Sequence, residues 1–253
     1  MEKKQKILTE SYKIASYLVN MKNRAGLYSV LNLIQDVGWI HGIHLQVRLP
    51  ENQNWVFTRQ KLIMNEWPVW DESLTIKTWI RPPLGPFLLR DYELFIGDRK
   101  IGEATSTFGV MDLQTRKMIT TDWKSYASIW QTTDHLVHMP QKIILTEKLS
   151  DLAQFQVRNS DLDMNQHVNN TKYSQWILDA VPLDIIKADL IIHEYEVNFL
   201  AETKSGDVVT VQGTKINPLL AATTLTQFQG IRFSDGKPVF TAQIKSSQAH
   251  PAT

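Results

Sequence analysis

A short polar segment, residues 159–170, gathers the side chains of this chain that could do chemistry. It reads Asn-Ser-Asp-Leu-Asp-Met-Asn-Gln-His-Val-Asn-Asn and stands directly before an amphipathic pattern. Asp163, Asn165 and His167 are spaced by two residues, so in extended geometry their side chains would project to one side. An asparagine amide can donate to a developing oxyanion, and a histidine can move a proton near neutral pH. This pattern suits chemistry at an acyl carbonyl group.

Helix capping is a simpler explanation for part of this segment. Asp and Asn are favoured at helix starts because their side chains accept hydrogen bonds from the first unpaired backbone amides. Capping accounts for one or two of the residues and leaves the Asn165 and His167 pair unexplained. The same amides at the helix start could receive a carbonyl oxygen as it becomes an oxyanion, so we expect them to belong to the site.

The polar segment does not itself supply a carboxylate placed to polarise water, and Glu202 is the candidate for that role. It lies in the segment Asn-Phe-Leu-Ala-Glu-Thr, residues 198–203, just ahead of a turn at Gly206 and Asp207. A glutamate within an apolar strand is unfavourable unless it is paired or functional. An exposed position at a strand edge is the alternative explanation.

The helices expected to position these residues repeat along the chain. Hydrophobic residues recur at helical spacing in each half, as Leu27, Val30, Leu31, Ile34, Val37 and Ile40 and again as Val168, Tyr173, Trp176, Ile177 and Ala180. We expect Gly38 and Gly42 to weaken and end the first helix, and Pro182 to stop the second.

Strand patterns follow each helix. Residues 74–80 alternate in character, and residues 207–212 are rich in β-branched side chains. Hairpin turn sequences recur as well, at residues 96–98 and 234–236. One helix followed by an antiparallel meander, twice over, predicts an α+β fold in which each sheet wraps its helix.

The repeat divides the chain into an expected first domain over residues 1–122, a connector over 123–150 and a second domain over 151–253. The first-half counterpart of the polar segment, residues 21–26, contains no histidine. We therefore expect one active site per chain, in the second domain, with the first domain serving mainly to bind substrate.

Composition removes several other classes of function. The net charge is +1 and cysteine is absent, so we expect no nucleic-acid partner, disulfide or thiol nucleophile. The N-terminus lacks an apolar run and no stretch approaches ~18 apolar residues, which predicts a cytoplasmic protein without a membrane span. His41 with His44, and His135 with His138, lack a third ligand, so neither metal nor cofactor is expected.

The motif Asp-Leu-Asp-Met-Asn-Gln-His-Val-Asn-Asn, continued by Lys172-Tyr173 and Trp176-Ile177-Leu178, closely resembles the plant and bacterial fatty acyl–acyl-carrier-protein (ACP) thioesterase family. Further landmarks of the family lie in the first half, as Trp55-Val56 with Arg59, Trp67-Pro68-Val69-Trp70, Thr105-Ser106, Met111 and Thr115-Arg116. The resemblance implies two tandem hotdog domains, each an antiparallel sheet wrapped around a long central helix. It also implies hydrolysis of fatty acyl-ACP to free fatty acid and ACP, in fatty acid biosynthesis.

The resemblance assigns catalysis to Asn165, His167 and Glu202, and an orienting role to Asp163. Plant members often carry Cys directly after the glutamate, where this chain has Thr203, so a cysteine nucleophile cannot operate and direct attack by water is favoured. Either Glu202 or His167 could be the base.

The expected partner is ACP carrying a fatty acyl chain. Because carrier proteins are acidic, a basic surface is expected, and the available residues are Arg24, Arg59, Lys61, Arg81, Arg90, Arg99 and Lys100. Seven of the eight tryptophans lie in or just after the first domain, where they could form an acyl tunnel or simply its core.

Other functions and assemblies fit the same residues. An acyl-CoA thioesterase and a non-catalytic acyl-binding sensor or scaffold are the alternatives, and hotdog folds also support hydratase chemistry. Both a monomer and a homodimer are compatible with two tandem domains.

Overall fold

The computed structural model describes residues 5–214 and 224–248, and it divides the chain into two compact units, Met1–Pro140 and Gln141–Thr253. We call them unit 1 and unit 2. The connector expected over residues 123–150 contributes its first part to unit 1 and its last part to unit 2. None of the helices in the described ranges combines the length and the apolarity needed to cross a membrane.

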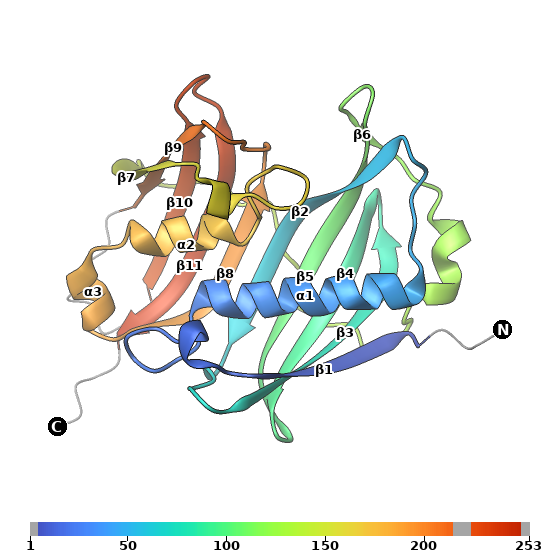
Figure 1. Ribbon diagram of the computed structural model, residues 1–253, viewed down its shortest axis with the longest axis horizontal. Helices are drawn as coiled ribbons and strands as arrows, with labels where there is room; N and C mark the ends of the chain where they lie inside the picture. Colours follow the sequence, from blue (N-terminus) through green and yellow to red (C-terminus); the bar gives the residue numbers. More distant parts are fainter. Residues whose placement is uncertain (1–4, 215–223, 249–253) are drawn as a thin grey trace. The chain divides into compact units, whose positions relative to one another are not determined.

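Unit 1 is an antiparallel sheet with one long helix lying across it (Figure 1). Its elements are β1 (Ile7–Lys13), η1 (Ser16–Leu18), α1 (Leu27–Leu45), β2 (Gln53–Met64), β3 (Ser73–Leu84), β4 (Phe87–Ile96), β5 (Arg99–Asp112), β6 (Met118–Ile119) and η2 (Trp123–Ile129). The strands follow the order β1-β3-β4-β5-β2, and β6 pairs with β5.

Unit 2 repeats this arrangement with a shorter helix. Its elements are β7 (Ser150–Gln156), η3 (Asn159–Asp161), α2 (Lys172–Asp179), α3 (Leu183–Lys187), β8 (Leu190–Phe199), β9 (Val208–Gly213), β10 (Thr224–Arg232) and β11 (Pro238–Gln248). The order β8-β11-β10-β9-β7 is the order of unit 1 read from the other end. The predicted α+β class and the two tandem hotdog-type domains are confirmed.

The strand and turn predictions also hold within each unit. Residues 74–80 lie in β3, with Leu74, Ile76, Thr78 and Ile80 buried at every second position, and residues 208–212 lie in β9. Both predicted hairpins form, joining β4 to β5 and β10 to β11. Gly97 and Gly236 there adopt φ of 56° and 66°, the left-handed region that glycine enters without steric cost.

The predicted end of the first helix is wrong, because α1 passes through both glycines to Leu45. At Gly38 an added Cβ would lie 2.9 Å from the Tyr92 hydroxyl oxygen, so the glycine permits close approach of the helix to β4. The helix ends where Gln46 turns left-handed, at φ 53°, and donates its backbone N–H to Gly42 and Ile43.

The second helix is shorter than its hydrophobic pattern suggested. It begins at Lys172, so Val168 lies before it, paired with Leu162 in an isolated bridge. Pro182 separates α2 from α3, which confirms its predicted role as a stop.

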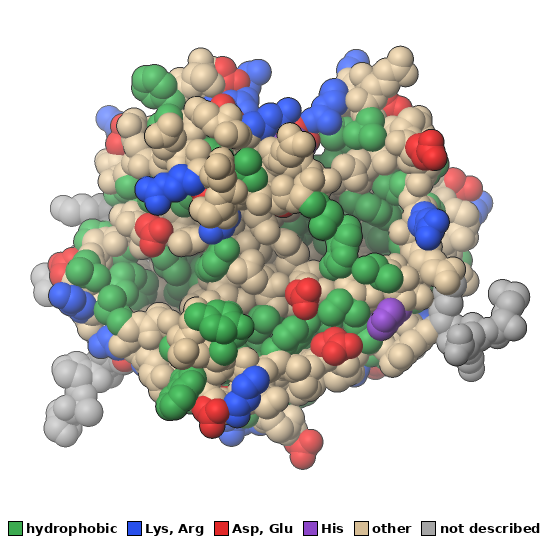
Figure 2. Space-filling model, viewed as in Figure 1, with side chains coloured by type: hydrophobic (Ala, Val, Ile, Leu, Met, Phe, Trp, Pro, Cys, Tyr) green, Lys and Arg blue, Asp and Glu red, His purple; other side chains and the backbone are tan. Residues whose placement is uncertain are grey.

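The tryptophans of unit 1 have different surroundings. Trp67, Trp79 and Trp123 are buried, as expected for a core. Trp39 and Trp70 are 60% and 55% exposed, so the structure places them in neither a core nor a tunnel. Figure 2 shows hydrophobic side chains along α1 on the visible face.

The irregular segment after η2 is held by buried polar side chains of the sheets. In unit 1 the Leu136 N–H donates to Asp91, which is 0% exposed, over 3.0 Å. In unit 2 the Ile143 N–H donates to Asn198 over 2.8 Å, and the Thr146 N–H donates to Gln227 over 2.9 Å. These buried side chains thus satisfy a backbone that lacks a strand partner of its own.

A buried histidine–arginine pair joins α1 to β4. Arg90 Nη1 lies 2.8 Å from His41 Nδ1, and His41 Nε2 lies 3.2 Å from the Gln5 carbonyl oxygen. The guanidinium can only donate, so Nδ1 accepts and Nε2 carries the hydrogen. Burial, with Arg90 adding to it, lowers the pKa of His41 from 6.5 to about 4.

We predict that unit 1 loses stability as pH falls from 7 to 5, because only the unfolded chain then protonates His41. The folded pKa of His41 is the lower one, so its contribution is complete above pH 6.5 and falls toward pH 4. The loss from this residue between pH 7 and pH 5 should be about 2 kcal/mol. Urea unfolding at both pH values measures it.

His41→Gln should remove that part of the pH dependence, since glutamine can still accept from Arg90 but does not titrate. His44→Gln is the matched control, because His44 is an exposed histidine of the same helix. An equal loss of unfolding free energy in wild type and His41→Gln would contradict the prediction.

Candidate active site

The polar segment forms a tight turn that Asp163 closes. Asp163 Oδ1 accepts the backbone N–H of Asn165 at 2.8 Å and that of His167 at 3.2 Å. Gln166 is left-handed at φ 62°, which reverses the chain. The extended geometry expected from the spacing of two is therefore wrong, because the aspartate bonds its own downstream amides instead.

This turn is docked on the segment that follows β8. The Val168 N–H donates to the Thr203 carbonyl oxygen at 2.8 Å, and His167 pairs with Lys204 in an isolated bridge. The backbone pairing sets His167 Nε2 3.4 Å from Glu202 Oε2, with side chains 26% and 34% exposed. The structure thus brings together two of the predicted site residues from distant parts of the sequence.

Asn165 lies in the same turn, with its side chain exposed. The backbone amides between the turn and α2 already donate within the protein: His167 to Asp163, Val168 to Thr203, Asn169 to Asp161, and Thr171 and Lys172 to Asn169. The expectation that such amides receive the substrate oxygen is therefore wrong for these five. The side-chain amide of Asn165 is an exposed donor of this turn, and exposed Gln166 carries another.

Thr203, which directly follows Glu202, is fully buried. Its Oγ1 accepts a hydrogen bond from the Tyr173 hydroxyl at 2.9 Å. Burial raises the pKa of Tyr173 to about 12, so the phenol keeps its proton at neutral pH and remains the donor. Thr203 therefore secures the segment that carries Glu202 to α2.

Arg232 is a residue of this site that the sequence did not reveal. Its Nη1 donates to the backbone carbonyl oxygen of Glu202 at 2.7 Å. The residue lies at the end of β10, and its nearness to Glu202 follows from strand pairing rather than from any motif.

Unit 1 contains the same turn without the same chemistry. Asn20 Oδ1 accepts the backbone N–H of Lys22 at 2.8 Å and that of Arg24 at 3.3 Å, and Asn23 is left-handed at φ 60°. Lys22 and Arg24 therefore occupy the positions that Asn165 and His167 hold in unit 2.

The docking of the turn is also repeated. The Ala25 N–H donates to the Pro68 carbonyl oxygen at 2.7 Å, as Val168 does to Thr203, so buried Trp67 stands at the position of Glu202. The turn is thus a feature of the fold, and only unit 2 carries the residue types suited to acyl chemistry.

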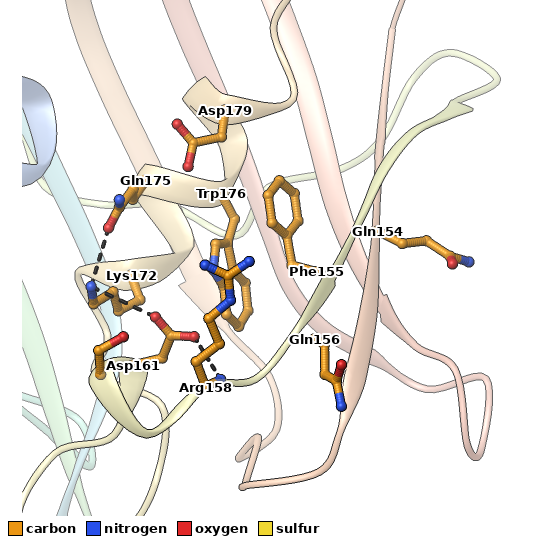
Figure 3. Close-up of a pocket in the computed structure, with 10 residues that line it drawn as sticks. Gln154, Phe155, Gln156, Arg158, Asp161, Lys172, Gln175, Trp176 and Asp179 are labelled. Carbon is orange, nitrogen blue, oxygen red and sulfur yellow. Dashed lines mark hydrogen bonds and ion pairs between the residues drawn. The ribbon is translucent and has the colours of Figure 1, made fainter.

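A cavity of about 220 Å³ opens between β7 and α2 (Figure 3). Its lining is mostly polar and consists of Gln154, Phe155, Gln156, Arg158, Ser160, Asp161, Lys172, Gln175, Trp176 and Asp179. Lys172 there bonds Gln175 at 3.2 Å and pairs with Asp161 at 3.6 Å. Asn165, His167 and Glu202 do not line this cavity, so it is separate from the candidate site.

Three of the four histidines in the pairs noted in the sequence, His41, His135 and His138, have other partners. His41 uses both ring nitrogens, and His138 Nδ1 lies 2.8 Å from Glu103. Within residues 5–214 and 224–248, no three His, Cys, Asp or Glu side chains form a group that could hold a metal ion.

Comparison with known proteins gives relatives along both units. The acyl-ACP thioesterase N-terminal domain matches residues 5–129, and the acyl-ACP thioesterase C-terminal domain matches residues 146–245. The chloroplastic oleoyl-acyl carrier protein thioesterase 2 of Arabidopsis thaliana is 26% identical over an alignment of 247 positions, which covers 87% of this chain and 66% of that protein. The palmitoyl-acyl carrier protein thioesterase of the same plant is 25% identical and covers 98% of this chain. The chain spans 66% and 65% of the length of these two relatives.

Solved structures share the fold across the whole chain. An acyl-ACP thioesterase from Bacteroides thetaiotaomicron superposes with a TM-score of 0.81 at 21% identity, covering 98% of this chain and 100% of that one. The 12:0-ACP thioesterase from Umbellularia californica has a TM-score of 0.83 at 19% identity, covering 96% and 94%. With both domains matched in order along its sequence, this chain belongs to the acyl-ACP thioesterase family.

Proposed function

We propose that the chain hydrolyses fatty acyl-ACP thioesters to free fatty acid and ACP, as a step of fatty acid biosynthesis. The observation that carries this proposal is the 3.4 Å contact between His167 Nε2 and Glu202 Oε2, beside the turn that presents Asn165. Family membership supplies the substrate class, because the plant relatives are named for acyl carrier protein thioesters.

Glu202 is the general base in the proposed reaction. A carboxylate only accepts hydrogen bonds, so the contact is best made when His167 Nε2 carries a hydrogen. A histidine protonated at that atom cannot take a proton there, whereas the carboxylate can take one from water. As the thiolate departs, His167 gives it the Nε2 hydrogen and takes up in the same step the proton that Glu202 received from water, so both groups return to their starting state.

Asn165 and Asp163 support the reaction of this pair. The exposed amide of Asn165 donates to the thioester oxygen as negative charge develops on it. Asp163 holds Asn165 and His167 through their backbone amides at 2.8 and 3.2 Å and is thus a positioning residue. Water attacks directly, since the chain has no cysteine and Thr203 is fully buried.

ACP is the proposed partner, and not all of the expected basic residues are available to it. Arg90 is only 7% exposed and bonds His41, so its inclusion among the surface candidates was wrong. Arg99 pairs with Glu66, and Lys100 pairs with Glu93 and Glu103.

Acyl-CoA hydrolysis would use the same chemistry with a different recognition surface. A cytoplasmic location and a homodimer remain predictions, which fractionation and light scattering would test.

We predict that His167→Ala lowers kcat for acyl-ACP by about 10²- to 10⁴-fold, because proton transfer to the leaving group is lost. Thiol release measured on acyl-ACP and acyl-CoA of several chain lengths gives the rates without interference from protein thiols. Glu202→Gln should fall in the same range, and exposed His44→Ala is the control that keeps wild-type turnover.

The possible outcomes separate the alternatives. Faster release from acyl-CoA than from acyl-ACP would make CoA, not ACP, the carrier of the acyl group and would leave the proposed chemistry unchanged. Acyl binding without thiol release in the wild type would favour the sensor or scaffold. Full turnover by His167→Ala would remove His167 from the mechanism.

The repeated turn supplies a second prediction with an internal control. Asp163→Ala and Asn20→Ala each remove a side chain that closes the same turn, so each should cost about 1 kcal/mol of unfolding free energy. Only Asp163→Ala should lower kcat, because only its turn carries Asn165 and His167. Parallel urea titrations and thiol-release assays measure both effects, and a comparable drop in kcat for Asn20→Ala would refute the assignment.

A further inference from the structure

We infer that Arg232 is a positioning residue of the hydrolysis, holding the backbone of Glu202 so that its carboxylate meets His167. The inference rests on the proposed function. Arg232 Nη1 donates to the carbonyl oxygen of Glu202 at 2.7 Å, directly beside the residue that carries the proposed base.

The guanidinium is itself fixed by an acid of the β10–β11 hairpin. Arg232 Nε bonds Asp235 Oδ1 at 3.0 Å, and Nη2 bonds Asp235 Oδ2 at 2.8 Å. Such a two-point contact sets the plane of the guanidinium and aims the remaining nitrogen. Asp207 Oδ2 lies 3.9 Å from Nη1, and the arginine side chain is only 18% exposed.

The hydrogen bond from Arg232 holds the peptide group between Glu202 and Thr203, and the next residue along the chain is already held by other contacts. Thr203, the next residue, accepts the Val168 N–H through its carbonyl oxygen and the Tyr173 hydroxyl through its side chain. Arg232 adds the bond to the carbonyl of Glu202 itself. Without that bond, the peptide between Glu202 and Thr203 can rotate, and the 3.4 Å contact to His167 loses one support.

Unit 1 indicates that the fold does not require this arginine. Arg232 pairs with Val209, two residues after Asp207, whereas Ile96 pairs with Leu74, two residues after Glu72. Ile96 thus occupies the corresponding position in unit 1, where Trp67 replaces the glutamate. The arginine is present in the unit that has a carboxylate to position.

The test is steady-state kinetics on acyl-ACP with a double-mutant cycle. Arg232→Ala should lower kcat about 10- to 100-fold with little change in KM, because a displaced base affects the chemical step more than binding. Arg232→Lys should recover part of kcat by supplying one donor. In a Glu202→Gln background, Arg232→Ala should cost less than about 3-fold, since both changes act through one residue.

Matched variants separate positioning from general destabilisation. Lys237→Ala is the control, because Lys237 also pairs with Asp235, at 3.6 Å, yet is 69% exposed and has no role at Glu202. If Arg232→Ala fails to fold, Asp235→Asn releases the guanidinium more gently and should show a smaller loss of kcat with the same lack of additivity.

Three results would overturn the inference: wild-type kcat in Arg232→Ala, an undiminished loss in the Glu202→Gln background, or an equal loss in Lys237→Ala. If Arg232→Ala is active while His167→Ala is not, only the positioning role fails. If the wild type releases no thiol, the proposed function fails, and crystal structures of wild type and Arg232→Ala then decide the positioning role. A displaced Glu202 would support it, and an unmoved Glu202 would contradict it.

Discussion

The hydrogen bond from the Val168 N–H to the Thr203 carbonyl oxygen is the contact on which the site depends. It joins the turn before α2 to the segment after β8, and so sets His167 beside Glu202. Being a backbone contact, it does not depend on which side chains stand there, and unit 1 makes it between Ala25 and Pro68. The fold therefore docks the same turn in both units, and the residue types at the turn decide which unit can carry out the reaction.

Much of the fold followed from local patterns, because periodicity and turn chemistry act within a few residues. The α+β class, the strand at residues 74–80, both hairpins and the stop at Pro182 are of this kind. The continuation of α1 through Gly38 could not be predicted from local patterns, because its cause is the close approach of Tyr92, which lies on β4. A glycine that would weaken an isolated helix is favourable where a backbone must approach a sheet closely.

The candidate site, too, could be predicted only in part, because some of its features have local causes and others depend on distant contacts. Residue types and the family motif pointed to Asn165, His167 and Glu202, but the spacing of two suggested an extended chain where Gln166 is left-handed. Asp163 accepts the backbone N–H groups of Asn165 and His167, which in an extended chain would need partners on a neighbouring strand. Whether the segment forms this turn or a strand depends on its contacts with the segment after β8, which are distant in the sequence. Arg232 carries no signal in the sequence, because only the pairing of β9 with β10 brings it to Glu202.

Exposure separates the polar groups that build this protein from those suited to react. Arg90, His41 and Asp91 are each under 10% exposed and bonded to neighbours, so a change of partner there would leave a buried polar group unsatisfied. His167 and Glu202 are 26% and 34% exposed, and their 3.4 Å contact is longer than an ordinary hydrogen bond. A loose, partly exposed pair can exchange its contact for water or a thioester at low cost. The rigid supports behind it, Asp163, Thr203 and Arg232, keep the two groups in place while that exchange occurs.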